Sequence, residues 1–349
     1  MCAVFSVLRC IILAGRPSGR CCHRNLAGSA RLMRHGTATR PGGWPWHDAT
    51  MANRAAADRR AGDACPPLLS GRSVRDALGG LPLPEGPAGN PLTWAQALGL
   101  GEPVASVNAN RNSWNRASAA YQQRCDPQIG AAARLWGNYS IPDSELGALG
   151  DVTGLRVLEL GCGAGQWSRS LAREACRLVG LDLSDAQLDA ARRAMGAIPY
   201  PLVQGAAEQL PFATGSFDLV FCDHGGLSWA PPDVAVPEAA RVLRQRGRLV
   251  FTVTSPWLRA CYDDSSDRVT ASLHHDYFGP AAATGEDGAT SYTLGYGDWI
   301  RTLRSAGLVI DDLIEPRPDP GKPSTYLTCE PADWARHWPC ENLWVCHKP

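Results

Sequence analysis

Apolar runs separated by glycine turns are the clearest pattern in the chain, and the first clear run begins at Val157. Residues 157–160 read as a buried parallel strand. Glycines then stand at alternate positions, Gly161, Gly163 and Gly165. They let the backbone turn sharply and approach a ligand that a Cβ would exclude. A helical pattern over 166–174 and an apolar run ending in Asp182 complete a predicted strand–turn–helix–strand unit that binds a nucleotide.

Similar alternation continues to the C-terminus and predicts an α/β domain over residues 105–349. A helix is expected over 108–124, with Trp114, Ala117 and Tyr121 on one stripe. Further helices are expected to begin at Pro237 and to span 297–307, and Ser184 to Gln187 has the pattern of a capping box. Further strands are expected in four places: 215–222, 247–253, 308–315 and 342–347.

The first 104 residues have a different composition. They are rich in Gly, Pro, Ala and Arg, show no sustained periodicity, and have no acidic residue before Asp48. This predicts an extension with little regular structure, or a sequence that starts too early, with translation truly beginning near Met33 or Met51. A targeting or nucleic-acid-binding role is the alternative. The apolar stretch 3–14 is far too short to span a bilayer.

The glycine spacing distinguishes two classes of cofactor. A dinucleotide fingerprint needs a small residue at position 166, where this chain has Gln166. The spacing Glu159-x-Gly161-x-Gly163-x-Gly165, with Asp182 about 20 residues beyond the first glycine, resembles the first motif of class I methyltransferases that use S-adenosylmethionine. Later segments follow that family's order: 205–212, 215–222, 238–243 and 247–253. From about Val107 onward the chain is similar to the small-molecule branch called methyltransferase type 11, and most similar to uncharacterised bacterial members.

The resemblance implies a Rossmann-like, mostly parallel seven-stranded sheet with an antiparallel last strand and helices on both faces. It implies S-adenosylmethionine as cofactor, with Asp182 on the ribose hydroxyls and Glu159 on the amino group. A solvent-facing charge is the alternative for either carboxylate. The remaining residues expected around the cofactor are Tyr121, Gly161, Cys162, Gly163, Gly165, Leu183, Gln187, Ala206, Ala207, Glu208 and Cys222. Relatives carry aspartate where this chain has Ala206, which removes one hydrogen bond to adenine.

Catalysis of methyl transfer requires little beyond placement of the acceptor opposite the sulfonium. A general base helps only if the acceptor is protonated. The candidates are Asp223 and His224, because their loop leaves a strand at its carboxyl end, where open α/β sheets bind ligands. A structural or substrate-shaping role for either residue is the alternative. Trp136 and Tyr139 are candidates for a lid or for packing.

Acceptor recognition is expected from residues 254–296, a segment too long for a simple connection. Its aromatic and histidine side chains are Trp257, Tyr262, His274, His275, Tyr277 and Phe278. The adjacent histidines point apart on a strand and lack a spaced third ligand, so no metal site is expected.

Composition agrees with this resemblance, and the absence of other motifs makes a small molecule the expected substrate. The formal net charge is zero and no motif of nucleic-acid methylation is found, so neither nucleic acid nor membrane is an expected partner. The 13 cysteines are scattered, which favours a reduced, cytoplasmic protein, and the arginine excess over two lysines is typical of bacteria. The leading hypothesis is methyl transfer to an O, N or C atom of a small molecule. The alternatives are a non-catalytic cofactor-binding or scaffold protein and, third, an NAD-dependent oxidoreductase.

Overall fold

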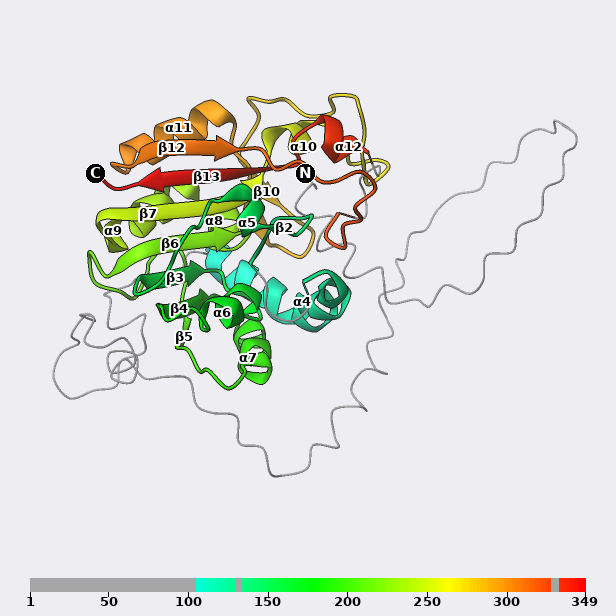
Figure 1. The fold of residues 1–349 in the computed structure, drawn as a ribbon. Helices are drawn as coiled ribbons and strands as arrows, with labels where there is room; N and C mark the ends of the chain where they lie inside the picture. Colours follow the sequence, from blue (N-terminus) through cyan, green and yellow to red (C-terminus); the bar gives the residue numbers. More distant parts are fainter. Residues whose placement is uncertain (1–104, 130–133, 328–332) are drawn as a thin grey trace, which may run out of the picture. The chain divides into compact units, whose positions relative to one another are not determined.

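A seven-stranded sheet forms the centre of the computed structural model, which describes residues 105–129, 134–327 and 333–349. The predicted extension 1–104 lies outside these residues. The strand order is β12-β13-β7-β6-β3-β4-β5, as Figure 1 shows. The strands are β3 (Arg156–Leu160), β4 (Arg177–Asp182), β5 (Leu202–Gln204), β6 (Phe217–Asp223), β7 (Leu243–Thr254), β12 (Val309–Ile314) and β13 (Glu341–His347).

The pairing confirms the predicted Rossmann-like sheet. β5, β4, β3, β6 and β7 are parallel, whereas β13 is antiparallel to both of its neighbours, β7 and β12. From β3 the chain adds β4 and β5 on one side of the sheet and then β6 and β7 on the other. Open α/β sheets bind ligands where the strand order reverses in this way, beyond the carboxyl ends of the strands. Because β13 runs the opposite way, its first residue, Glu341, pairs with Thr254 at the carboxyl end of β7. The first residue of β13 therefore lies at the edge of the sheet where the parallel strands have their carboxyl ends.

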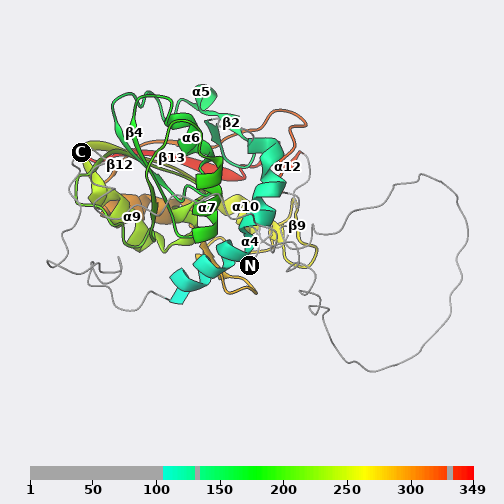
Figure 2. The same cartoon turned by 90° about the horizontal axis from the view of Figure 1, so that it is seen from below.

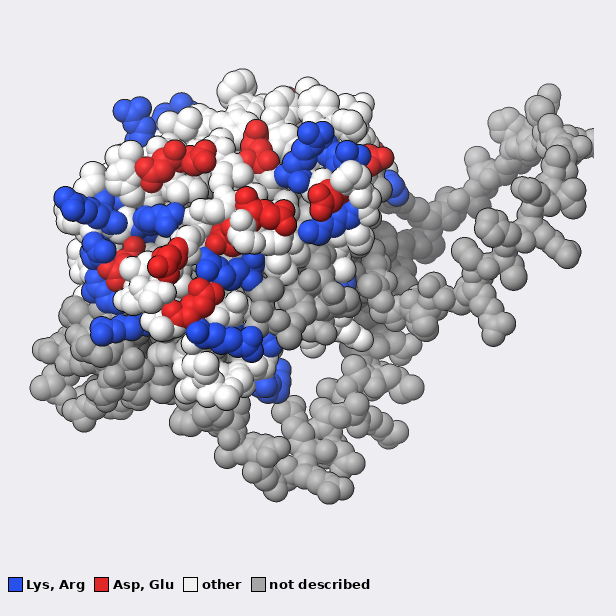
Figure 3. Space-filling model, in the orientation of Figure 1, with Lys and Arg blue, Asp and Glu red and all other residues white. Residues whose placement is uncertain are grey.

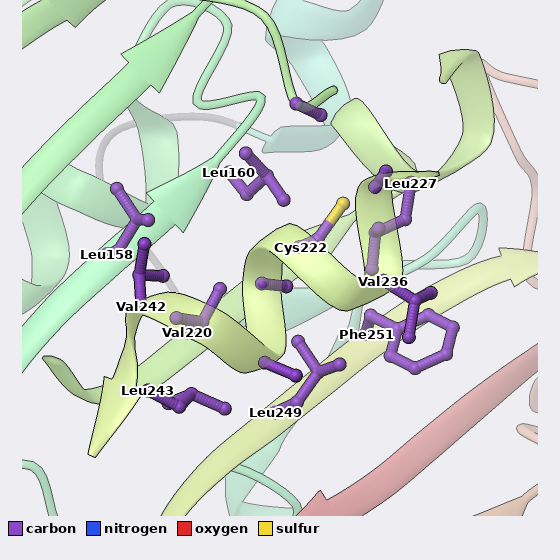
Figure 4. Packing of buried hydrophobic residues seen from close by; sticks show 14 of the residues in the cluster. Leu158, Leu160, Val220, Cys222, Leu227, Val236, Val242, Leu243, Leu249 and Phe251 are labelled. Carbon is purple, nitrogen blue, oxygen red and sulfur yellow. The ribbon is translucent and has the colours of Figure 1, made fainter. Parts of the chain in front are cut away.

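Helices cover both faces of the sheet (Figure 2). One face packs against α6 (Gln166–Leu171) and α7 (Asp185–Ala194). The other packs against α8 (Gly226–Trp229), α9 (Pro232–Val242) and α11 (Tyr296–Ser305). Successive side chains of β3 point to opposite faces of the sheet. Leu158 and Leu160 pack on the face covered by α8, α9 and α11, whereas Val157 packs on the face covered by α6 and α7. Figure 4 shows the α8–α9 side of this packing, with Cys222 between Leu160 and Leu227 in this view.

Several predicted boundaries are wrong by a few residues. α9 begins at Pro232 and holds Pro237 inside it, because Pro232 already occupies the first turn, where a missing N–H costs nothing. β7 begins at Leu243, where it pairs with Phe217 across a register shift, so it is longer than the apolar run 247–253. α6 ends at Leu171, before the predicted end at 174.

The predicted helix over 108–124 is confirmed within α4 (Ala105–Ile129), which lies beyond the carboxyl ends of the strands (Figure 1). Its buried Asn110 donates to Trp229 O at 2.7 Å and Thr290 O at 2.9 Å, and accepts from Thr290 N at 2.6 Å. α4 is thus fastened to α8 and β11. The remaining short elements are β1 (Leu135–Trp136), β2 (Ile141–Pro142), α5 (Asp143–Leu146), α10 (Pro256–Ala260), β8 (Tyr262–Asp263), β9 (Arg268–Val269), β10 (Ala282–Thr284), β11 (Thr290–Tyr292) and α12 (Trp334–His337).

The charges on the face shown in Figure 3 are mixed, with acidic and basic side chains interspersed. Within the described ranges, no helix combines the length and apolar character that crossing a bilayer requires.

Candidate functional site

The glycine turn after β3 is shaped by close backbone packing. Gly161 has φ +83°, and a Cβ there would lie 2.4 Å from Gly226 N and 2.6 Å from Gly225 Cα. Gly165, also left-handed, would place a Cβ against the Tyr200 hydroxyl. Gly163 differs, since the nearest atom to its Cβ position is 4.0 Å away. Gly161 and Gly165 are therefore required by the protein itself, and Gly163 leaves open space on the ligand side.

Asp182 ends β4 with its carboxylate held by the turn. One oxygen accepts from Gly163 N and the other from Ser184 N, each at 2.8 Å. Burial raises the pKa of Asp182 to about 6, although these N–H groups act to lower it. As predicted, Ser184 caps α7 by accepting from Gln187 N. In a capping box the Gln187 side chain would also accept a hydrogen bond from Ser184 N. Here Ser184 N donates to Asp182 instead, and the Gln187 amide oxygen accepts from Gln122 on α4 at 2.8 Å.

A cavity opens at this edge of the sheet, between the glycine turn, the loop after β5 and α8. Most of the expected cofactor and catalytic residues line it: Tyr121, Gly161, Gly163, Asp182, Leu183, Gln187, Ala207, Glu208, Asp223 and His224. Residues not singled out from the sequence also line it: Leu160, Leu181, Gly205, Gly225, Gly226, Trp229 and Ala230. Trp114, from the predicted stripe on α4, lines it too. We call this the cofactor cavity.

The other expected cofactor residues do not line this cavity. They are Glu159, Cys162, Gly165, Ala206 and Cys222. The side chains of Glu159, Cys162 and Cys222 are buried inside the domain. Ala206 forms an isolated bridge with Gln209, and the cavity surface of that loop comes from its neighbours Ala207 and Glu208.

A second cavity shares Trp114, Tyr121, Asp223, His224 and Trp229 with the first. Its other lining residues are Gly137, Asn138, Ser228, Thr254, Tyr326 and Leu327. We call it the acceptor cavity. Of the predicted insert 254–296, only Thr254 lines this cavity, and acceptor recognition by that segment stays a prediction.

The aromatic residues expected to form the insert's binding surface lie elsewhere. Tyr262 is fully buried and packs in a core with Val269, whereas Phe278 is 93% exposed. Trp136 and Tyr139 are also buried in cores, which decides for packing over a lid role. No periodicity or motif in the sequence singled out the residues that line the cavity instead: Asn138, Ser228, Tyr326 and Leu327.

Asp223 and His224 stand where the two cavities meet. His224 has φ +50° and its Nε2 lies 2.8 Å from an oxygen of Glu341, whose side chain is fully buried. The same oxygen accepts from Asn138 N at 2.8 Å, and Asp223 accepts from Gly137 N at 3.1 Å. Glu341 was missed from the sequence because it enters the site only through the antiparallel placement of β13.

The electrostatics of this group are set by burial and by neighbouring carboxylates. Burial raises the pKa of Asp223 to about 6, with the charge of His224 acting against it. For His224, burial lowers the pKa, but the hydrogen bond and negative charge of Glu341 together with Asp223 outweigh burial and raise it above 6.5. A histidine in this position is a candidate general base near neutral pH.

Residues 158–251 match a protein family described as methyltransferase domain. This segment is a methyltransferase domain of the type 11 kind. Its fold is also that of a solved structure described as an S-adenosylmethionine-dependent methyltransferase from Listeria monocytogenes, with TM-score 0.51 and 24% identity over 59% of this chain and 97% of that one.

Curated relatives of the methyltransferase domain are more similar in sequence but match over shorter spans. A malonyl-[acyl-carrier protein] O-methyltransferase from Legionella pneumophila is 40% identical over 29% of this chain and 37% of its own. A fatty-acid O-methyltransferase from Mycolicibacterium smegmatis is 37% identical over 33% of this chain and 45% of its own. The chain thus spans less than half the length of these relatives.

Within the methyltransferase domain, Glu159 is not the solvent-facing charge of the alternative interpretation. Its side chain is buried on β3 and accepts a hydrogen bond from Ser168 on α6. Burial raises the pKa of Glu159 to about 8, the Ser168 bond acting against it and the charges of Asp223 and Asp182 adding to it. Glu159 is therefore a carboxyl group that is protonated near neutral pH in the ligand-free domain.

The raised pKa of Glu159 predicts a pH-dependent stability. A carboxyl group whose pKa is higher in the folded state than in the unfolded chain binds more protons when folded, so stability falls as pH rises. Here the window runs from 4.5 to about 8. We expect the melting temperature of the ligand-free protein to fall from pH 5.5 to 8.5, and Glu159→Gln to remove a few kcal/mol of this dependence. An unchanged slope in thermal melts of Glu159→Gln would contradict this assignment.

Proposed function

We propose that this protein transfers a methyl group from S-adenosylmethionine to a small-molecule acceptor. The observation that carries the proposal is the Asp182 carboxylate, which two backbone N–H groups orient at the wall of the cofactor cavity. A carboxylate held in this way can accept hydrogen bonds from two neighbouring ribose hydroxyls. Gly163 leaves the space beside it that a bound nucleoside needs.

The charge of the cofactor cavity fits a cationic ligand. Its ionisable lining side chains are Asp182, Glu208, Asp223, His224 and Tyr121, and among the described residues neither lysine nor arginine lines it. S-adenosylmethionine carries a positive sulfonium and an ammonium group, whereas a dinucleotide carries an anionic pyrophosphate that favours basic groups. The lining therefore supports the methyl donor over NAD, in agreement with Gln166.

The two cavities suggest how the reactants are arranged. When bound in the cofactor cavity, S-adenosylmethionine supplies an activated methyl group. Residues shared by both cavities, His224 and Asp223 among them, would surround the point where this methyl group meets the acceptor. The aromatic residues of α4 and α8 would exclude water there, which favours an in-line displacement.

The relatives' names give a range of acceptors: malonyl-acyl carrier protein, a fatty acid and demethylmenaquinone. For this chain we propose a small molecule without adopting any of these. A cytoplasmic location is proposed as well, supported by the scattered spacing of the cysteines along the chain and by the burial of most of those in the described ranges.

A non-catalytic cofactor-binding protein on the same fold is the second candidate. The missing carboxylate at Ala206 favours it, since one hydrogen bond to adenine would be lost. Ala207, next to it on the same loop, lines the cofactor cavity.

Calorimetric titration of the full chain tests the cofactor assignment. We expect S-adenosylmethionine and S-adenosylhomocysteine to bind, and NAD to give no heat above dilution. Saturable binding of NAD without binding of S-adenosylmethionine would overturn the proposal in favour of an oxidoreductase.

A further inference from the structure

The acceptor cavity has an aromatic wall drawn from three separate parts of the chain. Trp114 and Tyr121 come from α4, Trp229 from α8, and Tyr326 from the segment that precedes α12. Trp114 packs edge-on against Tyr121 and Trp229, with ring centroids 5.3 and 5.1 Å apart. Tyr121 and Tyr326 are 6.0 Å apart. Rings arranged in this way suit a flat aromatic molecule, which they contact by stacking and by edge-to-face packing.

The charge around this cavity disfavours an anionic acceptor. No lysine or arginine of the described ranges lines it, and Arg124, although it lies on α4, is not part of the lining. Asp223 lines the cavity and Glu341 lies directly behind His224. A carboxylate buried here would face Asp223 and Glu341, and protonated His224, which Glu341 already engages, is the one cation among the described lining residues, so burying the carboxylate is costly. A neutral acceptor avoids this cost.

The pairing of His224 with Glu341 determines which nitrogen can act as a base. Nε2 of His224 is engaged by the Glu341 carboxylate, which can only accept, so this nitrogen carries the proton. Nδ1 is then the nitrogen with a free lone pair. A buried carboxylate that orients a histidine and stabilises its cationic form is the arrangement that makes histidine an effective base.

Ser228 offers a further polar contact in the same cavity. Its side chain is only 3% exposed, and its hydroxyl has no hydrogen-bond partner within the described residues. Unpartnered buried hydroxyl groups are unfavourable, so a polar substituent on the acceptor would satisfy this one.

We infer that the acceptor is a neutral, planar aromatic molecule with an ionisable hydroxyl group, which His224 deprotonates through Nδ1 while Glu341 positions His224. The inference rests on the proposed function. In the step, the hydroxyl O–H bond breaks and its proton moves to Nδ1. The oxygen forms a bond to the methyl carbon as the carbon–sulfur bond breaks, and the sulfur keeps that electron pair as S-adenosylhomocysteine leaves.

A histidine base is useful only if the reacting group of the acceptor is still protonated at neutral pH. Phenolic hydroxyls have a pKa near 10, which a histidine can deprotonate in concert with transfer. Carboxylic acids are already ionised at neutral pH and need no base, so for them the His224–Glu341 pair would have no catalytic purpose.

A matched set of ligands tests the acceptor class: 2-naphthol, 2-naphthoic acid and 2-naphthylamine share one ring system and differ in the reacting group. Methylation is followed with isotope-labelled S-adenosylmethionine, and binding by tryptophan fluorescence in the presence of S-adenosylhomocysteine. We expect 2-naphthol to be methylated and to bind at least about tenfold more tightly than 2-naphthoic acid. Preference for the acid or the amine, or no preference among the three, overturns the inference.

Glu341→Gln tests the positioning role, with Glu286→Gln on the exposed loop before β11 as the matched control. Turnover of 2-naphthol is expected to fall about 10- to 100-fold in Glu341→Gln, and further in His224→Asn. Asparagine is chosen because it tolerates the left-handed backbone at this position. Binding of S-adenosylmethionine should change less than threefold in Glu341→Gln, because Glu341 does not line the cofactor cavity.

The pH profile separates positioning from mere structural support. The charged groups facing His224 are Asp223 on β6 and Glu341 on β13. Removing the Glu341 charge makes protonated His224 less stable, so the acid limb of kcat should move to lower pH in Glu341→Gln. An unmoved limb overturns the positioning role. Loss of S-adenosylmethionine binding by the wild-type protein would instead defeat the proposed function, and the calorimetric titration detects that separately.

Discussion

Asp182→Ala is expected to weaken S-adenosylmethionine binding by about 100-fold, with little loss of folded protein. The carboxylate is the group placed to accept both ribose hydroxyls, and hydrogen bonds to charged groups contribute about 1.5–3 kcal/mol each. Its removal also frees Gly163 N and Ser184 N, which hold the turn and the start of α7. Calorimetric titration of the variant measures the change.

Asp189→Ala is the matched control for Asp182→Ala. Asp189 lies on α7, its side chain is 49% exposed, and it forms an ion pair with Arg192 on the same helix. Its loss should leave cofactor affinity within twofold, because surface ion pairs contribute little. Equal affinities of wild type and Asp182→Ala would show that the ribose is not held by this carboxylate.

Gly161→Ala is expected to destabilise the domain by about 2–5 kcal/mol, because overpacking and a left-handed backbone both act at this position. The new Cβ would lie 2.4 Å from Gly226 N, and neither atom can move aside without displacing the β3 turn or the start of α8. Thermal and urea unfolding measure the effect.

Two other glycines separate the causes. Gly307 has φ +77° and nothing within 4 Å of its Cβ position, so Gly307→Ala reports backbone strain alone, about 1–2 kcal/mol. Gly163→Ala should leave the protein folded but weaken S-adenosylmethionine binding, because its Cβ would project into the cavity. If Gly161→Ala were no more destabilising than Gly307→Ala, the close approach to α8 would be contradicted.

The sequence was sufficient for the sheet and for the floor of the cofactor cavity, because these depend on local patterns. The Gly161–Gly165 turn, the carboxylate at Asp182 and the loop holding Ala207 all follow directly from a strand end. Each parallel strand ends at the same edge, so these local patterns converge without further information. The aromatic stripe on α4 was found for the same reason.

The acceptor cavity could not be predicted in this way. Glu341 meets His224 across 117 residues of sequence, through the antiparallel course of β13. Tyr326 joins Tyr121 from a segment without regular structure. The length and aromatic content of segment 254–296 predict a role in acceptor binding, yet much of that content packs into cores or faces solvent. Length alone does not indicate which side of a loop faces a ligand.

The most direct test of the account is transfer of the methyl group itself. The full chain is incubated with isotope-labelled S-adenosylmethionine and a metabolite extract of the host cell, and products are identified by mass spectrometry. We predict a labelled small-molecule product formed in step with S-adenosylhomocysteine, and none with Asp182→Ala at the same cofactor concentration. Tight binding of S-adenosylmethionine with no labelled product would contradict the account and support a non-catalytic cofactor-binding protein.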